Sequence, residues 1–373
     1  MTNKPDTLII LTPGFPENEA DSTCIPPQQI FVKALKDNYP RLNIIVLTFY
    51  YPFCSSRYQW HGVDVISFGG NGKGRIYSKV TGIRAWAGLK KINKEYHIIG
   101  LLSFWLGKCA FIGSWFAEKY HLKHYCWILG QDAKAGNKYV RRINPKGKSL
   151  IGLSDFIVAE FKKNYGIIPE YTIPVGIDTS LFNETAAERT IDIIGAGSFI
   201  PLKQYHVFVE VIKLLKEDFP SIKTCICGDG PEMMHLRTMI DIMDLEDNIK
   251  LLGRQTHAQV LALMQKSKIF LHTSNYEGFG AVCLEALYAG AQVVSFVKPM
   301  DTDIENWHIV EDKETMVRSL RTILQNQDLK YQSVFPYSIH DNAKAAMELF
   351  DYNLAAISRI RVAMASNERF DLK

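Results

Sequence analysis

Two glutamates eight positions apart, Glu277 and Glu285, enclose a glycine-rich turn and the first residues of a predicted helix. The turn reads Gly-Phe-Gly (278–280), and glycine lets the backbone bend sharply while leaving its N–H groups open to a ligand. The N-terminus of the following helix attracts anions, and carboxylates accept strong hydrogen bonds from hydroxyl groups. The spacing therefore predicts a site for a diphosphate that carries hydroxyl-rich sugars. The alternative interpretation is an exposed loop glutamate and a solvated helix face.

Two apolar segments on either side must position this site. Residues 268–273 are typical of a buried strand, and residues 291–296 are typical of the next one. The local order is strand, glycine turn, helix and strand, which is the repeating unit of a doubly wound sheet. In such sheets ligands bind outside the carboxyl ends of the strands.

The segment 274–290 resembles the E-x7-E motif of the retaining glycosyltransferases of family 4, which have the GT-B fold. Other pieces follow the order of that family along nearly the whole chain. Residues 191–203 resemble the strand and loop that open the C-terminal domain, and residues 224–231 resemble the strand that ends in Gly-Asp-Gly-Pro. Residues 249–254 resemble the strand that ends beside the nucleotide base. The bridge between the domains is resembled by residues 154–165 and 173–178 together with Phe182.

The resemblance implies a role for each matching residue. Lys203 would contact the donor diphosphate, Glu277 would position sugar hydroxyls, and Glu285 would hold the ribose. Glu277 and Lys203 are thus the candidate catalytic residues. The candidate donor-binding residues are Glu285, Gly278, Phe279, Gly280, Ala281, Ser198 and Arg254.

The chain departs from the family pattern at two places. Ser198 stands where the family usually has an arginine, and Arg254 is one residue that would compensate for the missing charge. The run Leu-Gly-Gln-Asp (129–132) stands where the family commonly has His-Gly-x-Asp, so the sugar-contacting histidine is absent there. On the acceptor side the candidates are Gly14 and Asp132. Their alternative interpretations are a plain strand-to-helix loop and a helix N-cap.

Strands and helices are predicted to alternate in two successive cycles. The first cycle has strands at 7–12, 43–50, 63–67, 98–102 and 124–129, and the second runs from residue 192 to about 324. This alternation predicts α/β domains with parallel sheets covered by helices on both faces. The resemblance implies a GT-B fold, in which two Rossmann-like domains face each other across a cleft. We expect an acceptor-side domain at 1–175, a donor-binding domain at 176–345, and a C-terminal helix at about 346–373 that crosses back to the first domain.

Net charge is only +4 over 373 residues, but it is distributed unevenly. Residues 1–175 hold 23 Lys and Arg against 12 Asp and Glu, whereas residues 176–373 hold 20 against 27. Basic clusters at 90–94, near Trp86, and at 138–148 predict contact with an anionic membrane or a lipid-diphosphate acceptor. The alternative is an ordinary solvated surface. Because no nucleic-acid module accompanies the charge, a nucleic-acid partner is not expected.

The remaining composition indicates a cytoplasmic enzyme. No apolar run is long enough to span a membrane, and the first residues lack a signal-peptide pattern. The seven cysteines form no C-x-x-C pair, and Cys225 and Cys227 in a predicted buried strand are interpreted as reduced core thiols. Asp301 and Asp303 have the spacing of the Asp-x-Asp motif that chelates a metal ion, but they follow the donor motif and lie in a predicted turn.

The resemblance therefore implies a hexosyltransferase of polysaccharide biosynthesis. It would move a sugar from a UDP-, GDP- or ADP-sugar to a saccharide or lipid-linked acceptor. The resemblance implies retention of anomeric configuration, and we expect neither a cofactor nor a metal. The alternatives are a sugar-nucleotide epimerase or hydrolase on a similar scaffold and a non-catalytic nucleotide-sugar-binding protein. A NAD-dependent dehydrogenase is disfavoured, because the first strand is not followed by a G-x-G-x-x-G turn.

Overall fold

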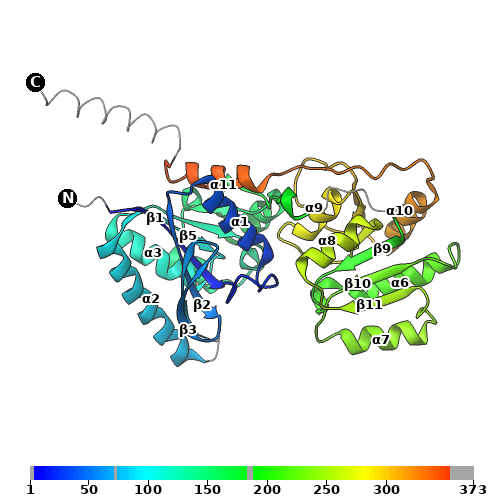
Figure 1. Ribbon diagram of the computed structural model, residues 1–373, viewed down its shortest axis with the longest axis horizontal. Helices are drawn as coiled ribbons and strands as arrows, with labels where there is room; N and C mark the ends of the chain where they lie inside the picture. The colour runs from blue at the N-terminus through cyan, green and yellow to red at the C-terminus, as the bar shows by residue number, and fades with distance from the viewer. Residues whose placement is uncertain (1–3, 71–73, 183–187, 353–373) are drawn as a thin grey trace, which may run out of the picture. The chain divides into compact units, whose positions relative to one another are not determined.

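The computed structural model describes residues 4–70, 74–182 and 188–352, and these form two compact units (Figure 1). The first unit takes its described residues from Met1–Leu153, Val158–Pro174 and Ile339–Lys373. The second unit consists of Ser154–Ile157 and Val175–Ser338. Each unit is an α/β body built on one sheet.

The sheet of the first unit has eight strands in the described residues, in the order β3-β4-β2-β1-β5-β6-β7-β8. Every neighbouring pair is parallel except β3 and β4, which are antiparallel. The predicted all-parallel sheet is therefore wrong at this edge, where a short hairpin adds one polar, largely exposed strand. The strands are β1 (Asp6–Gly14), β2 (Asn43–Tyr51), β3 (Ser55–Trp60), β4 (Val63–Phe68), β5 (His97–Phe104), β6 (His124–Ile128), β7 (Leu150–Gly152) and β8 (Tyr171–Thr172).

Helices cover this sheet and bury its central strands. The core on one side packs apolar residues of β1, β2 and β5 against those of α2 and α3, with Phe116 fully buried. The helices α1 and α11 pack against each other, and Asn38 Nδ2 donates a hydrogen bond of 2.8 Å to the carbonyl of His340. The helices are α1 (Pro26–Asn38), α2 (Arg75–Glu95), α3 (Lys108–Tyr120), α4 (Lys138–Ile143), α5 (Asp155–Tyr165, which has residues in both units) and α11 (Ile339–Glu348).

The C-terminal helix differs from its predicted extent. The expected terminal helix begins at about residue 346, but α11 ends at Glu348 and is followed by a turn. Of the terminal helix expected at about 346–373, residues 353–373 lie outside the described residues.

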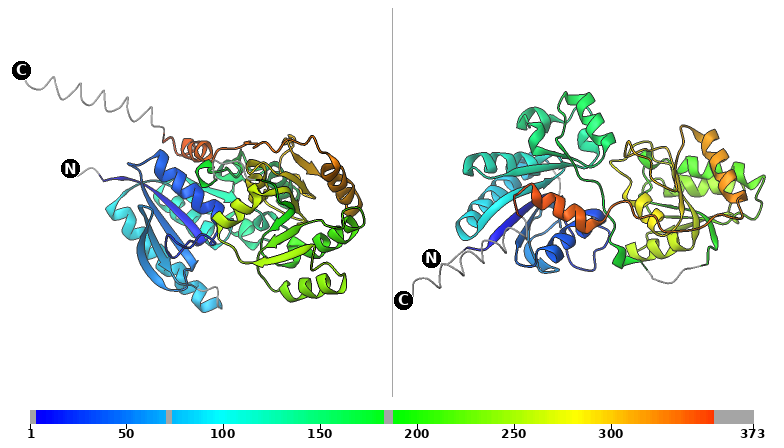
Figure 2. Two further views of the ribbon diagram at one scale, coloured as in Figure 1. Left: turned by 45° about the vertical axis from the view of Figure 1, so that its right-hand side comes forward. Right: turned by 90° about the horizontal axis from the view of Figure 1, so that it is seen from above.

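The second unit has an all-parallel sheet of six strands in the described residues, ordered β11-β10-β9-β12-β13-β14. Figures 1 and 2 show α7 on one side of this sheet and α8 and α9 on the other. The strands are β9 (Ile191–Ala196), β10 (Thr224–Cys227), β11 (Ile249–Gly253), β12 (Ser267–His272), β13 (Gln292–Ser295) and β14 (Trp307–Ile309). The helices are α6 (Tyr205–Lys216), α7 (Met233–Ile242), α8 (His257–Gln265), α9 (Ala281–Tyr288) and α10 (Lys313–Gln325).

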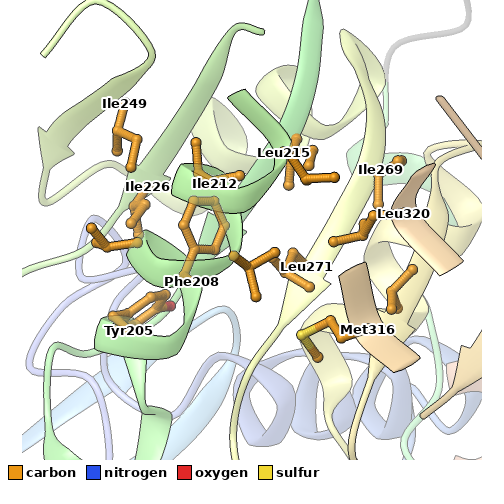
Figure 3. Close-up of a cluster of buried hydrophobic side chains, with 14 of the residues drawn as sticks. Tyr205, Phe208, Ile212, Leu215, Ile226, Ile249, Ile269, Leu271, Met316 and Leu320 are labelled. Carbon is orange, nitrogen blue, oxygen red and sulfur yellow. The ribbon is translucent and has the colours of Figure 1, made fainter. Parts of the chain in front are cut away.

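The core of the second unit lies between the sheet and α6, α7 and α10. Phe208 and Ile212 of α6 pack onto Ile226 of β10, and Met316 and Leu320 of α10 close the same cluster (Figure 3). Cys225 and Cys227 are buried free thiols in β10, as predicted. This packing holds the strands rigidly, so that the loops at their carboxyl ends have a fixed base.

Short 3-10 helices complete the described secondary structure. None of the described helices is both long enough and apolar enough to cross a membrane. The 3-10 helices are η1 (Gln131–Ala133), η2 (Gly147–Ser149), η3 (Thr179–Leu181) and η4 (Pro201–Lys203).

Candidate active site

The predicted donor residues lie in loops at the carboxyl ends of the strands in the sheet of the second unit. Because the strands of this sheet are parallel, their carboxyl ends lie together at one end of the sheet. The loop after β9 carries Lys203, the loop after β11 carries Arg254, and the loop after β12 carries Glu277. β9 and β12 are hydrogen-bonded neighbours, so the topology alone brings Lys203 and Glu277 close.

Lys203 and Glu277 form an ion pair at the centre of the site. Lys203 Nζ donates a hydrogen bond to Glu277 Oε1, and the two side chains are only 19% and 17% exposed. Thr273 Oγ1 donates to the carbonyl of Lys203 at 2.8 Å, which ties the loop after β12 to η4. The pair is therefore held by both its side chains and its loops.

A buried histidine lies against the same glutamate. His272, the last residue of β12, is 4% exposed, and its Nε2 is 3.4 Å from Glu277 Oε1. Burial raises the pKa of Glu277, but His272 and the charge of Lys203 lower it more, to about 2. Glu277 is thus ionised at neutral pH and available as a hydrogen-bond acceptor.

Glu285 has a histidine partner of its own. Glu285 Oε1 in α9 is 2.8 Å from His257 Nε2 in α8, and the side chains are 15% and 17% exposed. Burial lowers the pKa of His257, but the hydrogen bond and charge of Glu285 outweigh it, so that the pKa is raised. His257 begins α8 behind a capping box made by Thr256 and Gln259, which fixes its backbone.

The glycine turn between the two glutamates is anchored to the interior of the unit. The carbonyl of Gly278 accepts a hydrogen bond of 2.5 Å from Ser154 Oγ, which is fully buried. Phe279 is 1% exposed and packs against Trp307 and Tyr337, so its side chain is a core group and only its backbone can meet a ligand. The turn is fixed to the interior of the unit at two successive residues.

The helix that follows the turn starts without a side-chain cap. Gly280 has φ +87°, and no side chain in the described residues caps the N-terminus of α9 at Ala281. One turn into the helix, the buried thiol of Cys283 feels the charges of Glu277, Lys203 and Glu285, while burial is the main reason that its pKa is raised. The charges of both glutamates and of Lys203 therefore act on the first turn of α9.

The loop that carries Ser198 is shaped by one close backbone contact. A Cβ on Gly228 would lie 1.9 Å from the carbonyl oxygen of Gly197. Gly197 lies beside the stem of Lys203, since a Cβ on Gly197 would be in ordinary contact with Lys203 Cε at 3.7 Å. Ser198 follows Gly197 directly, is exposed and brings no charge.

Arg254 is not brought into contact with the ion pair. It is exposed and follows β11, which is separated from β9 by β10. Neighbouring strands lie about 4.8 Å apart, so the ends of β9 and β11 are about 10 Å apart. Arg254 therefore lies at the same carboxyl end of the sheet, but it follows a strand that is distant from β12, which precedes Glu277.

The two acceptor-side candidates lie at carboxyl ends of strands in the first unit. Gly14 ends β1, and its carbonyl accepts a hydrogen bond of 2.8 Å from Thr12 Oγ1. Asp132 lies in η1, so its interpretation as a helix N-cap is wrong: Gly130 holds that position. Its carboxylate instead accepts the amides of Leu106, Leu129 and Gly130 at 2.8, 3.1 and 2.9 Å.

Asp132 has a perturbed pKa for a structural reason. Burial raises the pKa of Asp132 to about 6, although the hydrogen bonds that its carboxylate accepts from backbone N–H groups lower it. Three backbone donors converge on this carboxylate, which fixes the ends of the loops after β5 and β6. The contacts made by Asp132 are those of a residue that holds backbone in place.

His257 and His272 are the site residues that sequence reasoning missed. His272 carries a weak signal, because it ends the strand directly before the motif, but a histidine there is equally typical of a strand end. His257 has no such signal: it is 28 residues from Glu285 and meets it only because α8 and α9 pack together. In the described part of the chain, no group of three or more His, Cys, Asp or Glu side chains is arranged to hold a metal ion.

Comparison with known protein families places this site in context. The family model "Glycosyl transferases group 1" matches residues 177–334, which lie in the second unit and contain both glutamates. One component of the phosphatidylinositol N-acetylglucosaminyltransferase of Arabidopsis thaliana is 30% identical over 128 residues. That alignment covers 34% of this chain and 29% of the plant protein, so the chain spans less than a third of this curated relative.

Solved structures resemble the whole chain. Sucrose-phosphate synthase from Thermosynechococcus elongatus has a TM-score of 0.67 at 15% identity, with 99% of this chain and 100% of that chain covered. HepE from Anabaena, solved with UDP and glucose, has a TM-score of 0.64 at 15% identity, with 98% and 100% covered. The predicted GT-B fold is confirmed by these structures. The family model over residues 177–334 and the Arabidopsis relative support the superfamily of group 1 glycosyl transferases.

Proposed function

We propose that the protein transfers a sugar from a nucleotide-diphosphate sugar to a saccharide or lipid-linked acceptor. The observation that carries the proposal is the Lys203–Glu277 pair beside the uncapped start of α9, with Glu285 in the same helix. A lysine and a helix N-terminus suit a diphosphate, whereas two ionisable carboxylates suit the hydroxyls at its two ends. The match to the group 1 model over this part of the chain supports the same function.

Each residue has a role in the proposed reaction. The diphosphate lies over the backbone near Gly280 and beside Lys203, and Glu285 holds the ribose. Glu277 accepts hydrogen bonds from the sugar that is transferred. As the bond to the anomeric carbon breaks, negative charge grows on the leaving diphosphate, and Lys203 lowers the barrier by stabilising that charge.

We further propose retention of anomeric configuration and a reaction without a metal. Retention follows from the resemblance of the E-x7-E segment to the family 4 enzymes. Lys203 and the start of α9 supply the positive charge that a metal would otherwise bring to the diphosphate. The stereochemistry can be read from the anomeric proton of the product by NMR, and the metal requirement from the rate in excess chelator.

UDP is the first nucleotide to test, with GDP and ADP as alternatives. The Anabaena neighbour was solved with UDP, and the name of the Arabidopsis relative includes N-acetylglucosamine as the transferred sugar and phosphatidylinositol as the lipid. UDP-N-acetylglucosamine and UDP-glucose are therefore the leading donor candidates. A lipid acceptor is one of the acceptor classes that we propose.

A donor panel separates this function from its rivals. The protein is incubated with UDP-, GDP- and ADP-sugars, with and without saccharide and lipid acceptors, and products are followed by chromatography and mass spectrometry. Sugar transfer, with nucleotide release that depends on an acceptor, is the expected result. An isomerised donor would instead support an epimerase. Nucleotide release without an acceptor would support a hydrolase, and saturable binding without turnover would support a binding protein.

A surface of the first unit supports a membrane as the place of the reaction. We define the aromatic-basic patch as the apolar and aromatic side chains of α2, α3 and α4 together with the cations beside them. The rings form a chain in which Trp86 is 6.5 Å from Trp115, Trp115 is 5.3 Å from Phe111, and Phe111 is 6.3 Å from Tyr139. The other members of the patch are Ile83, Lys119, Lys138 and Arg142.

The composition of this patch suits an anionic lipid surface. Ile83 is 70% exposed and Trp115 is 60% exposed, which is unusual for large apolar side chains on adjacent helices. Lys119 lies 6.0 Å from the Trp86 ring, and Lys138 and Arg142 lie 5.5 and 5.7 Å from the Tyr139 ring. Aromatic rings prefer the lipid headgroup layer, and each nearby cation adds attraction to anionic lipids. We propose a cytoplasmic protein that contacts the inner membrane face through this patch.

A further inference from the structure

His272 is a buried histidine whose ring nitrogens are poorly satisfied. It is 4% exposed, Nδ1 has no hydrogen-bond partner in the described residues, and Nε2 lies 3.4 Å from Glu277 Oε1 without the geometry of a good hydrogen bond. The hydroxyl of Ser274, two residues later and fully buried, also lacks a partner there. Buried polar groups without partners are rare, because each costs desolvation energy. Their presence directly beneath the proposed donor site calls for a functional reason.

His272 and Lys203 compete for one carboxylate oxygen. Lys203 Nζ donates to Glu277 Oε1, and His272 Nε2 is 3.4 Å from the same atom. With Lys203 in place the negative charge of Glu277 is already balanced. Burial lowers the pKa of His272, Glu277 raises it, and the charge of Lys203 lowers it again, so that the ring is neutral in this state.

We propose that His272 takes up a proton when a nucleotide-sugar binds, and that its imidazolium then replaces Lys203 as the cationic partner of Glu277. This inference deepens the proposed function and rests on it, because it requires Lys203 to turn toward the diphosphate. It makes His272 a positioning residue, which holds Glu277 ionised and in place for the sugar hydroxyls.

Electrostatics favours this exchange of partners. A diphosphate brings negative charge to the site and draws the ammonium group of Lys203 away from Glu277. A carboxylate left uncompensated in a buried site is costly, whereas a nearby group that gains a proton removes the cost. Once Lys203 has turned away, Nε2 of His272 is the basic nitrogen of the described residues that remains within 4 Å of Glu277.

The other groups around the glutamate cannot take this proton. Tyr205 and Cys283 also interact with Glu277, but burial raises the pKa of both, so they already carry their protons at neutral pH. Phe270, whose ring is stacked near that of His272 at 6.3 Å, does not titrate. His272 faces Glu277 and Lys203 as its charged neighbours in the described residues.

The proposal fixes the sign of a pH effect on binding. If the complex holds one more proton than the free protein, affinity falls as pH rises through neutrality. The phosphates of a nucleotide-sugar are fully ionised at neutral pH, so the ligand does not contribute a proton of its own. Binding heats measured in two buffers of different ionisation enthalpy give the number of protons taken up.

The test is calorimetry on the full chain with UDP-glucose, UDP-N-acetylglucosamine, GDP-mannose and ADP-glucose as probes. For the probe that binds, the wild-type protein is expected to take up close to one proton at about pH 7, and its affinity to fall severalfold over the next pH unit. The asparagine side chain of His272→Asn can still donate a hydrogen bond, but it does not titrate near pH 7. The number of protons that this variant takes up on binding is therefore expected to fall by the proton that His272 takes up in the wild type. His308→Asn is the matched control, because His308 is a histidine of the second unit whose ring, among the described residues, contacts Gln292 and neither site glutamate, so proton uptake should be unchanged.

A direct observation keeps the proposal open to refutation even where the variant does not fold. With histidine labelled by ¹³C and ¹⁵N, the His272 ring signal of the wild-type protein is expected to shift to the imidazolium position on saturation with the probe. Binding without proton uptake, uptake that persists in His272→Asn, or a ring that stays neutral would overturn this inference and leave the proposed function intact. Failure of every nucleotide-sugar to bind would overturn both.

Discussion

At the scale of single residues, Lys203 is the group whose removal should affect the reaction most. Lys203→Ala removes the positive charge that stabilises the leaving diphosphate. By analogy with the loss of one oxyanion donor, the cost is about 2–4 kcal/mol in the transition state, or about 30- to 1000-fold in kcat. The measurement is steady-state kinetics on the best donor of the panel.

A matched lysine serves as the control for this variant. Lys298 also pairs with a carboxylate in the second unit, but Lys298 and Asp303 are 43% and 90% exposed. Lys298→Ala should therefore leave kcat within a factor of two or so of the wild type. Equal rates for Lys203→Ala and the wild type would remove Lys203 from the catalytic assignment.

The Glu285–His257 pair predicts a pH-dependent contribution to stability. Because Glu285 raises the pKa of His257 in the folded state, the pair stabilises the fold fully below the unfolded-state pKa. That stabilisation is lost as pH rises through the raised pKa. Glu285→Gln should thus lower the free energy of unfolding more at pH 6 than at pH 9, as measured by urea denaturation.

The double variant isolates the pair from other titrating groups. In a His257→Asn background the effect of Glu285→Gln should no longer change between the two pH values, because the titrating partner is gone. A pH-dependent difference that survived in this background would show that another group is responsible.

At the scale of elements, the site depends on two loops that touch through their backbones. A Cβ at Gly228 would lie 1.9 Å from the Gly197 carbonyl oxygen, and Gly228 has φ +156°. Gly228→Ala should therefore displace the loop after β9, which carries Lys203, and destabilise the protein by about 3 kcal/mol or more. We expect a lower melting temperature in thermal unfolding and a weaker affinity for the donor.

Gly253 provides the comparison for backbone strain without a clash. It has φ +70°, but a Cβ there would meet nothing within 4 Å. Gly253→Ala should cost only the conformational penalty of about 1–2 kcal/mol. If the two variants were equally stable, contact between the loops would not be what makes Gly228 necessary.

Sequence reasoning succeeded where an element has a strong local pattern. The buried strands β1, β2, β9 and β12 each contain a short apolar run, and the prediction placed them correctly. The strand β3 was missed because its residues are mostly polar and exposed, so neither alternation nor burial marks it. An edge strand that pairs antiparallel with β4 is defined by its partner rather than by its own sequence.

The candidate site could be proposed from the sequence to the extent that it lies within one continuous motif. Glu277 and Glu285 follow from the spacing itself, and Lys203 followed from resemblance. The contacts of His257 and His272 were not predictable, because they arise from the packing of α8 on α9 and from the burial of a strand end. Asp132 shows the converse: a residue expected at the acceptor side has its carboxylate occupied by backbone amides.

At the scale of the whole molecule, the uneven charge of the chain and the aromatic-basic patch predict membrane association. The double variant Ile83→Ser/Trp115→Ser should weaken binding to vesicles at least tenfold, since burial of each large apolar side chain contributes about 1.5–3 kcal/mol. Vesicles of phosphatidylglycerol and phosphatidylcholine are compared with vesicles of phosphatidylcholine alone in a sedimentation assay.

An exposed apolar residue elsewhere provides the control. Ile242 at the end of α7 is 74% exposed in the second unit, outside the patch. Ile242→Ser should leave vesicle binding unchanged, and wild-type binding should weaken with added salt because the cations act on anionic lipid. Binding that is equal for both vesicle types, or unaffected by the double variant, would contradict the patch as the contact surface.

The discontinuous make-up of the first unit has a consequence for protein synthesis. Its sheet is translated first, but α11, which packs on α1, is translated only after the entire second unit. Until α11 has been translated, the surface of α1 that it covers stays exposed to solvent, whereas all strands of the second unit have already been synthesised. We therefore expect the later-encoded unit to reach its native form first, and the nascent amino-terminal half to be the part that chaperones protect.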